Sequence, residues 1–557
     1  MRRMGLTLAA GLLLASSGPA QLTTDQRLAD FRYLASLYAQ RYAPYEWKRD
    51  FLKFDLLELP PWLERVQKAK DDLDYYEIAV DYVASLDDGH AGYFLPSTFA
   101  ASLGFSVDIY DGKVLIDSVT RQRLPAEQYP FEVGDELVSV DGSTAQELIK
   151  RFAKYLVAGY QRGTERSAAA VIVSRRQELV PRAHEIGEEA KVVVRRASGA
   201  TETYSIPWRK TGVPVTVLAP GRSPRSAAPR RGAEEGPAYL RPWQRLRNMK
   251  LPEPRAVLGQ AALKPVFDLP EGFTLRLGAR TYDSFYSGTF EAGGLKIGFL
   301  RIPDFDIFRF VSTFEKEIAY FQENTDGLIL DLMRNPGGDG CLAESLLARV
   351  IPFKFRVLTV EARVLWSDLL EAKSDLEQAQ RTGAKPETLQ EMEAWANELE
   401  FAYRENKGRT RPLPLCSNAL ERDPATDKSG NLIAYTKPVM VLIDEISFSA
   451  AELFVAVIQD SKRGPLFGMR TGGGGGSVAE FPVGVYAEGS ANVTLALASR
   501  KEPVSVPGYP TVAYIENVGV HPEVVADYMT RENLLNKGRP FVDAFVAKMV
   551  EHIQANK

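Results

Sequence analysis

The sequence predicts a multidomain α/β protein, and three observations lead to that prediction. The chain has 557 residues, and at roughly 150 residues per domain this length favours three or four domains. Apolar residues make up 45% and charged residues 25%, which is typical of a folded globular chain. The pattern along the chain changes from helical periodicity to short alternating strands, and then to strands separated by helices.

The N-terminus and the charge balance indicate where the protein works. Two arginines, an apolar run from Leu6 to Ala15 and small residues up to Ala20 form the pattern of a cleaved signal peptide, residues 1–20. We therefore expect a secreted or periplasmic protein. No later stretch reaches about 18 uninterrupted apolar residues, so stable membrane insertion is not expected. The net charge of −4 gives no indication of a nucleic-acid partner.

Residues 21–98 are predicted to be helical. Apolar residues recur there at helical spacing, among them Phe31, Leu34, Leu37, Tyr38, Tyr76, Ile78, Ala79 and Val83. The segment ends in the polar loop DDGHAGYF, which carries His90.

Residues 99–208 are predicted to be a small β domain, with strands around a turn at Asp111-Gly112 and a later hairpin. The string SLGF, followed downstream by VGDELVSVDG, resembles a PDZ domain. In that family such a loop binds the C-terminal carboxylate of a peptide, which then adds as a strand. The resemblance implies peptide binding at Leu103, Gly104 and Phe105. Residues 143–190 exceed the usual length, so a purely structural domain is the alternative.

Residues 209–290 are expected to contain an exposed linker. The stretch APGRSPRSAAPRRGAEEGP is rich in Pro, Arg, Ala and Gly, a composition that cannot bury a core. A polyanion-binding tail is the weaker alternative, because Glu234 and Glu235 follow the arginines and no aromatic residues are interspersed.

Residues 291–540 are predicted to form an α/β core, followed by a C-terminal helix at 541–557. Short apolar strands at 295–302, 327–333, 439–445 and 466–471 are separated by helical patterns. A charged, Glu-rich segment at 364–410 is predicted to be a surface helical hairpin inserted in this core. The two cysteines, Cys341 and Cys416, could form one disulfide, but the sequence leaves their pairing open.

Two segments of the core carry candidate chemistry. In VMVLIDEISFSAAELF, Ser447 and Ser449 lie where a strand ends and a helix begins. Free backbone N–H groups and the positive end of the helix dipole can stabilise an oxyanion there, although serines at helix starts are often only caps. In GLILDLMRNPGGDG, a strand runs into Gly337-Gly338, whose backbone can approach a bound group closely. An ordinary turn is the alternative.

Together with YIENVGVHPEV, these strings resemble the tail-specific and tricorn clan of serine peptidases, whose core is the crotonase-like (ClpP-like) α/β fold. The resemblance spans nearly the whole mature chain apart from the linker and residues 364–430. A serine hydroxyl needs a base beside it, and imidazole suits neutral pH. The resemblance implies the nucleophile Ser449, the general base His90, the orienting carboxylate Glu516, and oxyanion donors at Ala450 and at Gly337 or Gly338.

The chain departs from the clan at two points. Peptidases of the Ser–Lys type carry a lysine in the glycine-rich segment, which here is RTGGGGGSV, so such a dyad would need Lys462 or Lys501. Tricorn-type enzymes have a serine before the histidine, where this chain has Gly89, so Glu516 would reach His90 directly or through water. His521 is the alternative base.

The sequence thus predicts a secreted serine endopeptidase that forms an acyl-enzyme on protein or peptide substrates, with no metal and no other cofactor. The resemblance also implies a homodimer and a zymogen that cuts an internal segment, for which residues 219–236 are the candidate. The alternative is a catalytically silent protein that binds peptides through its PDZ-like domain. The missing lysine and Gly89 keep that alternative open.

Overall fold

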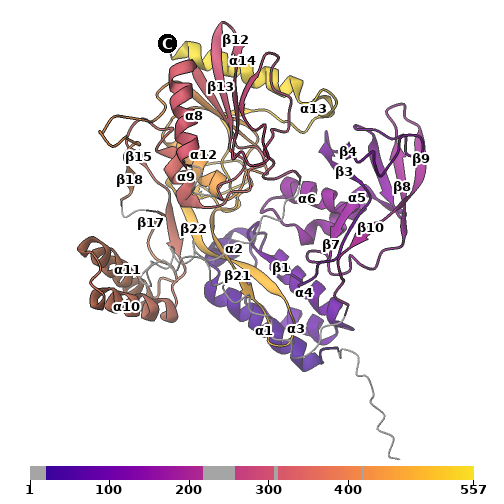
Figure 1. The fold of residues 1–557 in the computed structure, drawn as a ribbon. Helices are drawn as coiled ribbons and strands as arrows, with labels where there is room; N and C mark the ends of the chain where they lie inside the picture. Colours follow the sequence, from indigo (N-terminus) through magenta and orange to yellow (C-terminus); the bar gives the residue numbers. More distant parts are fainter. Residues whose placement is uncertain (1–20, 217–257, 307–310, 417–418, 557) are drawn as a thin grey trace, which may run out of the picture.

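The computed structural model describes residues 21–216, 258–306, 311–416 and 419–556. These residues form an N-terminal helical segment, a β-rich domain and an α/β core (Figure 1). The predicted signal peptide and the predicted processing stretch at 219–236 lie outside the described residues. In the described ranges, none of the helices combines the length and apolar character needed to cross a bilayer.

The N-terminal segment consists of four helices and a short strand. They are α1 (Thr24–Arg41), α2 (Tyr45–Leu52), α3 (Pro60–Gln67), α4 (Asp72–Ala84) and β1 (Gly92–Phe94). Thr23 and Gln26 form a capping box that starts α1. Arg27 on α1 pairs with Asp72 on α4 at 3.0 Å, with both side chains buried. The loop between α4 and β1 carries His90.

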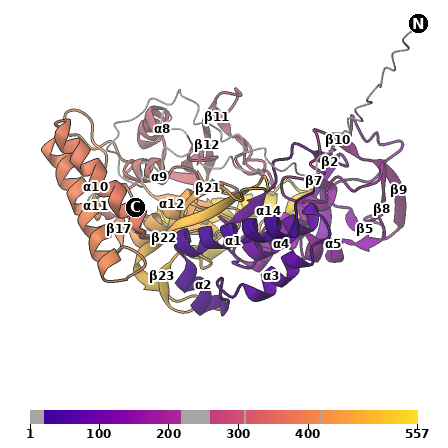
Figure 2. The same cartoon turned by 90° about the horizontal axis from the view of Figure 1, so that it is seen from below.

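This segment packs on strands from the C-terminal half of the chain. β1 pairs antiparallel with β22 (Ser490–Val504), which places Gly92 opposite Asn492. Tyr38 on α1 donates a hydrogen bond to the Asn492 carbonyl at 2.6 Å. Buried side chains of α1 and α4 share one hydrophobic core with β21 (Gly476–Pro482) and β22, and Figure 2 shows the helices beside these strands. The β1–β22 pairing therefore fixes the loop of His90 relative to the core.

The β-rich domain has the PDZ arrangement that the sequence predicts. Its main sheet has the order β3 (Phe105–Tyr110), β4 (Lys113–Val119), β5 (Glu136–Val140), β8 (Glu189–Arg195), β9 (Thr201–Pro207), with β6 (Ser143–Thr144) on β5. A second sheet joins β10 (Arg209–Thr211), β2 (Ala100–Ser102) and β7 (Ser174–Arg176). The long stretch after β6 folds as α5 (Ala145–Phe152), the 3-10 turn η1 (Ala153–Tyr155) and α6 (Gln161–Val173), and α6 packs on β3.

The α/β core is built on a seven-stranded sheet. Its order is β11 (Thr274–Leu277), β12 (Tyr286–Ala292), β13 (Leu295–Arg301), β14 (Gly327–Asp331), β19 (Val439–Ile443), β20 (Leu466–Gly468), β24 (Val524–Val525). The pairings from β13 to β24 are parallel. The central strands β14 and β19 are buried along their whole length, and they are apolar except for Asp331 at the end of β14, because both faces of the sheet are covered.

Helices cover the two faces of this sheet. On one face, side chains such as Leu328 and Leu330 pack against α8 (Val311–Asn324), α9 (Gly340–Leu347) and α12 (Ala450–Asp460). On the other face, Ile329 and Met440 pack with α14 (Arg539–Ala555), which the short helix α13 (Arg531–Leu535) precedes. The nucleophile candidate of the sequence analysis therefore lies at the start of a core helix.

A second sheet links the core to the N-terminal segment and carries the insertion. Its order is β1-β22-β16-β17, with β16 (Thr359–Ala362) and β17 (Leu413–Pro414), and β22 also pairs with β21 and β23 (Val512–Tyr514). Between β16 and β17, α10 (Trp366–Arg381) and α11 (Pro386–Arg404) form the predicted helical hairpin, which projects from the core in Figure 1. A short pair, β15 (Phe355–Arg356) and β18 (Glu421–Arg422), lies beside it in the chain.

The pairing of the two cysteines, which the sequence left open, is a disulfide between Cys341 and Cys416. It ties the first turn of α9 to the segment that follows β17.

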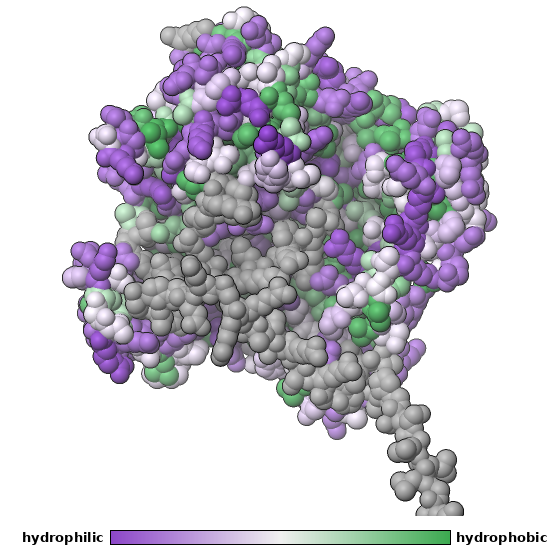
Figure 3. Space-filling view, viewed as in Figure 1, coloured by the Kyte–Doolittle hydropathy of each residue, from purple (hydrophilic) through white to green (hydrophobic). Residues whose placement is uncertain are grey.

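On the face shown in Figure 3, hydrophilic side chains predominate among the coloured residues, and hydrophobic ones occur in small groups.

Candidate active site

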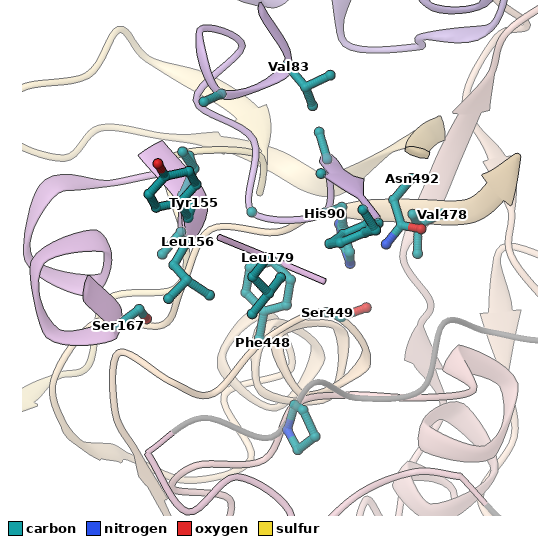
Figure 4. A pocket seen from close by; sticks show the side chains of 18 of the residues that line it. Val83, His90, Tyr155, Leu156, Ser167, Leu179, Phe448, Ser449, Val478 and Asn492 are labelled. Atoms are coloured by element: carbon teal, nitrogen blue, oxygen red, sulfur yellow. The ribbon is translucent and has the colours of Figure 1, made fainter. Parts of the chain in front are cut away.

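The two candidate serines differ in their bonding at the turn between β19 and α12. The Ser447 side chain is buried, donates to the Leu332 carbonyl at 2.8 Å and accepts from the Asp444 N–H at 3.0 Å. Ser447 is therefore a structural residue of the turn. Ser449 has φ 56° and ψ −119°, a strained conformation for a residue other than glycine. Ser449 lines the cavity at this turn (Figure 4).

Glu452 holds this turn against the glycine-rich segment. Its carboxylate is fully buried and accepts hydrogen bonds from the Ser449 N–H (3.1 Å), the Thr471 hydroxyl (2.6 Å) and the N–H groups of Gly473 and Gly474 (2.7 Å each). Burial raises the pKa of Glu452, and the four donors oppose that rise. The backbone of the glycine run thus holds, through Glu452, the turn between β19 and α12 that carries Ser449, which we call the nucleophile turn.

The Gly337-Gly338 loop passes directly beside Ser449. A Cβ on Gly337, where φ is 95°, would lie 2.6 Å from the Ser449 Cβ, so the close approach requires glycine. The Gly337 N–H donates to Asn335 Oδ1 at 2.8 Å, whereas the Gly338 N–H has no acceptor among the described residues. The Ala450 N–H, at the first position of α12, has no intrahelical acceptor. These two N–H groups are the donors that an oxyanion could use.

His90 is buried above Ser449 (Figure 4). Its ring packs on Phe448 with centroids 4.7 Å apart, and its backbone N–H donates to Asp88 Oδ1 at 2.7 Å. Within the described residues, neither ring nitrogen has a hydrogen-bond partner. Burial lowers the pKa of His90, and Lys48 lowers it further while Asp88 raises it. The imidazole is therefore held in its neutral, basic form.

Packing explains why Gly89 precedes this histidine. A Cβ on Gly89 would lie 2.7 Å from the Phe448 ring, so a serine at this position would displace the ring on which His90 packs. The departure from the tricorn pattern therefore has a local steric cause.

Two carboxylates lie beside His90. One ligand-type atom each of Asp88, His90 and Glu516 lies within 4.8 Å of the other two. Glu516 is fully buried, and its Oε1 accepts a hydrogen bond from Lys48 Nζ at 2.5 Å, while Oε2 has no partner among the described residues. Burial, reinforced by Asp88, raises the pKa of Glu516 to about 8, and Lys48 limits the rise.

Asp88 is already engaged on both oxygens. Oδ1 accepts the His90 N–H, and Oδ2 accepts the hydroxyls of Tyr42 (2.9 Å) and Thr494 (2.8 Å). Burial would raise the pKa of Asp88, but Lys48, His90 and the hydrogen bonds lower it overall. With these oxygens occupied and an ammonium on Glu516, the cluster fits proton transfer better than cation binding.

The sequence analysis missed Lys48 and Asp88. Lys48 Nζ donates to Glu516, to Asn517 Oδ1 at 2.7 Å and to the Asp87 carbonyl at 2.8 Å. No local pattern distinguishes Lys48 from a solvent-exposed helical lysine. The string DDGH was a usable signal for Asp88, because an aspartate two residues before a histidine can accept its backbone N–H.

The cavity beside Ser449 is built by all three parts of the chain. It has a volume of about 270 Å³, and His90, Ser449, Gly337 and Gly338 line it. The remaining wall is largely apolar, with Val80, Val83, Tyr155, Leu156 and Phe448 among its residues (Figure 4). The alternative groups His521, Lys462 and Lys501 do not line it. Instead, His521 Nε2 lies 3.1 Å from the Val518 carbonyl.

The PDZ loop predicted to bind peptides makes bonds within its own domain. The Leu103 N–H donates to the Val173 carbonyl at 2.9 Å. A Cβ on Gly104 would lie 2.9 Å from the Arg123 side chain, which donates to the Ser102 carbonyl at 2.6 Å. Phe105 starts β3, and its side chain is buried. Peptide binding at Leu103, Gly104 and Phe105 stays a prediction.

Known proteins resemble this chain over most of its length. Residues 296–525 match the family model of peptidase family S41, and residues 100–215 match a PDZ domain. A protein of Chlamydia trachomatis serovar D is 26% identical over 577 aligned positions, covering 90% of this chain and 89% of the relative. A protein of Chlamydia pneumoniae is 26% identical, covering 98% of this chain and 94% of the relative.

Among solved structures, mature CPAF complexed with lactacystin superposes with a TM-score of 0.73, at 22% identity, covering 96% of this chain and 99% of that one. A second structure of mature CPAF gives a TM-score of 0.73 at 21% identity. The shared fold includes the helical N-terminal part, the PDZ domain and the core.

The fold and the family matches define a serine peptidase with a PDZ domain. The protease core matches the model of peptidase family S41, and 96% of the chain superposes on the fold of CPAF, the chlamydial protease-like activity factor.

Proposed function

We propose that the protein is a secreted serine endopeptidase that cleaves proteins through an acyl-enzyme, with Ser449, His90 and Glu516 as its catalytic residues. One observation supports this assignment most. A strained serine at a helix start and a buried histidine, whose ring nitrogens have no hydrogen-bond partner in the described part of the chain, line the same cavity. An oxygen of the buried Glu516 carboxylate lies within 4.8 Å of a ring nitrogen of that histidine.

In the proposed reaction, Ser449 Oγ attacks the scissile carbonyl carbon and passes its proton to one ring nitrogen of His90. The N–H groups of Gly338 and Ala450 stabilise the oxyanion. Glu516 accepts a hydrogen bond from the other ring nitrogen, directly or through water, and stabilises the imidazolium. His90 then protonates the leaving amine, and a water molecule activated by the same base hydrolyses the acyl-enzyme.

The proposal includes export, activation and assembly. The signal pattern at residues 1–20 supports secretion or a periplasmic location. Residues 219–236 have the Pro-, Arg-, Ala- and Gly-rich composition of a linker, which supports internal cleavage of a zymogen in this segment. The resemblance to the peptidase clan supports a homodimer. Intact mass of the active enzyme checks for the internal cut, and sedimentation velocity checks for the dimer.

The central test is labelling with a serine-reactive fluorophosphonate, read by intact mass. We expect one adduct on the wild type and none on Ser449→Ala or His90→Ala. Ser461→Ala, at the opposite end of α12, is the matched control and should keep the adduct. Hydrolysis that persists in Ser449→Ala contradicts the proposal. A wild type that stays unlabelled even after limited proteolysis of residues 219–236, but binds peptides, supports the silent peptide-binding protein instead.

A further inference from the structure

Lys48 contacts Glu516, one of the proposed catalytic residues, although it belongs to the N-terminal helical segment. It is on α2, and its side chain is 1% exposed. An ammonium group has three donors, and Lys48 uses all of them, on Glu516 Oε1 (2.5 Å), Asn517 Oδ1 (2.7 Å) and the Asp87 carbonyl (2.8 Å). These bonds fix the position of the charge.

The three acceptors come from two segments that are far apart in sequence. Asp87 precedes the loop residue His90, whereas Glu516 and Asn517 follow β23 near the C-terminus. Asn517 adds a parallel link, because its Nδ2 donates to the Asp87 carbonyl at 2.8 Å and to the Gly159 carbonyl at 2.9 Å. Lys48 therefore joins the loop of the base to the turn of the carboxylate.

We propose that Lys48 is a positioning residue of the peptidase, which favours the ionised form of the Glu516 carboxylate and orients it for hydrogen bonding to His90. This inference rests on the proposed function, because it gives Lys48 a part in the same reaction. Lys48 occupies Oε1, while Oε2 has no partner among the described residues and can accept a hydrogen bond. One carboxylate oxygen of Glu516 lies within 4.8 Å of a ring nitrogen of His90. Its charge acts on the reaction through the two groups beside it, by direct contact with Glu516 and by lowering the pKa of His90.

The charges around Glu516 explain why a cation is needed. The acidic groups that raise the pKa of Glu516 are Asp88 from the His90 loop and Glu452 from α12, and the Asp87 side chain, next to Asp88, is also within the influence of Lys48. Tyr42, before α2, adds a phenol, and Arg470, after β20, acts on Asp87. Among these, Lys48 is the cation in direct contact with Glu516. Without it, burial and Asp88 would raise the pKa of Glu516 further, and a protonated Glu516 would not stabilise an imidazolium.

The effect of pH on activity follows from the pKa shifts of Glu516 and His90. Glu516, with a pKa of about 8, must lose its proton to act, so activity rises as the pH rises through this value. Lys48 lowers the pKa of Glu516 and also that of His90, which must be neutral to act as a base. Loss of Lys48 raises both pKa values, so both changes move the acidic limb of the activity profile to higher pH.

The test compares Lys48→Met with wild type, using kcat and KM on a fluorescent casein substrate between pH 6 and 10. At pH 7 we expect kcat to fall about 100-fold, the scale of lost acid–base assistance, with KM nearly unchanged. The midpoint of the acidic limb should rise by about one pH unit or more. The matched control is Arg27→Met, which removes another buried cation of the same segment, paired with Asp72 away from the cavity. Its pH profile should be that of the wild type.

A second variant keeps the test decisive if Lys48→Met does not fold. Lys48→Arg keeps the charge but cannot reproduce the three bonds, so kcat should fall while the acidic limb stays in place. An acidic limb that moves in Lys48→Arg, or an unchanged kcat and pH profile in Lys48→Met, overturns the inference. These results leave the proposed function intact as long as Ser449→Ala abolishes labelling. If Ser449→Ala does not abolish it, the proposed function fails first.

Discussion

At the residue scale, the conformation of Ser449 depends on Glu452, three positions later. Glu452 accepts four hydrogen bonds, two of them from Gly473 and Gly474, while Ser449 has φ 56°. Strained conformations persist where the surrounding structure imposes them. The four donors need an acceptor with four lone-pair sites, which a carboxylate provides and an amide does not.

Glu452→Gln should therefore lower both the reactivity of Ser449 and the stability of the fold. The amide NH₂ would face N–H donors, and an unsatisfied buried donor costs about 1–3 kcal/mol. We expect the fluorophosphonate labelling rate to fall about 10-fold or more and the free energy of unfolding in urea to fall by that amount. Glu480→Gln, on the exposed side of β21, is the control and should change neither. Normal labelling in a destabilised Glu452→Gln would show that Glu452 supports only the fold.

At the element scale, the disulfide Cys341–Cys416 connects the helical insertion to the oxyanion loop. Cys341 is in the first turn of α9, where Asp339 caps the helix by accepting the Cys341 N–H at 2.7 Å. Leu415 packs so closely that a Cβ on Gly340 would lie 2.6 Å from its side chain. The segment after β17 therefore packs against the start of α9, the helix that follows Gly337-Gly338.

Removing this disulfide should loosen the oxyanion loop. The bridge closes a loop with a sequence separation of 75 residues, and its loss typically costs about 2–4 kcal/mol. For the variant with Cys341→Ser and Cys416→Ser we expect that loss of unfolding free energy in urea, together with slower fluorophosphonate labelling. The reductant dithiothreitol should reproduce both effects in the wild type and change nothing in the variant. If the double variant loses stability but is labelled by the fluorophosphonate as fast as the wild type, the disulfide does not affect the Gly337-Gly338 loop.

The parts of the fold that could be predicted from the sequence are those encoded locally. The apolar runs of β14 and β19 and the hairpin of α10 and α11 follow from hydrophobic pattern and turn residues. The β1–β22 pairing joins residues 92 and 492, and no local pattern encodes it. Lys48 was missed for the same reason, because its acceptors at residues 87, 516 and 517 come together only through this long-range packing.

The candidate residues Ser449, His90 and Glu516 could be proposed from the sequence because each lies in a short motif with an unusual composition. Their placement together is a finding of the structure, and their catalytic roles stay a prediction. The motifs did not reveal which backbone donor is free. That depends on Asn335, which engages the Gly337 N–H. The side-chain environment of His90 likewise depends on Phe448, a residue of the nucleophile turn.

At the scale of the whole molecule, a buried ion network joins the PDZ domain to the nucleophile turn. Arg166 on α6 is 1% exposed, donates to Asp108 on β3 at 2.7 and 3.0 Å, and reaches Glu445 at 3.1 Å. Arg162 adds a contact to Glu445 at 2.7 Å. Burial raises the pKa of Glu445, and the two arginines oppose that rise. Since Glu445 lines the cavity four residues before Ser449, the PDZ domain is part of the active-site wall.

Arg166→Met should uncouple the PDZ domain from the core. It leaves two buried carboxylates, Asp108 and Glu445, without their shared cation, and breaking a buried pair in this way costs about 3–5 kcal/mol. We expect calorimetry to show the PDZ domain and the core unfolding together in the wild type and in separate transitions in the variant. Arg195→Met, which breaks an exposed pair with Glu136 in the same domain, should change stability by less than about 1 kcal/mol. A single, unshifted transition in Arg166→Met would mean that apolar packing alone holds the PDZ domain against the nucleophile turn.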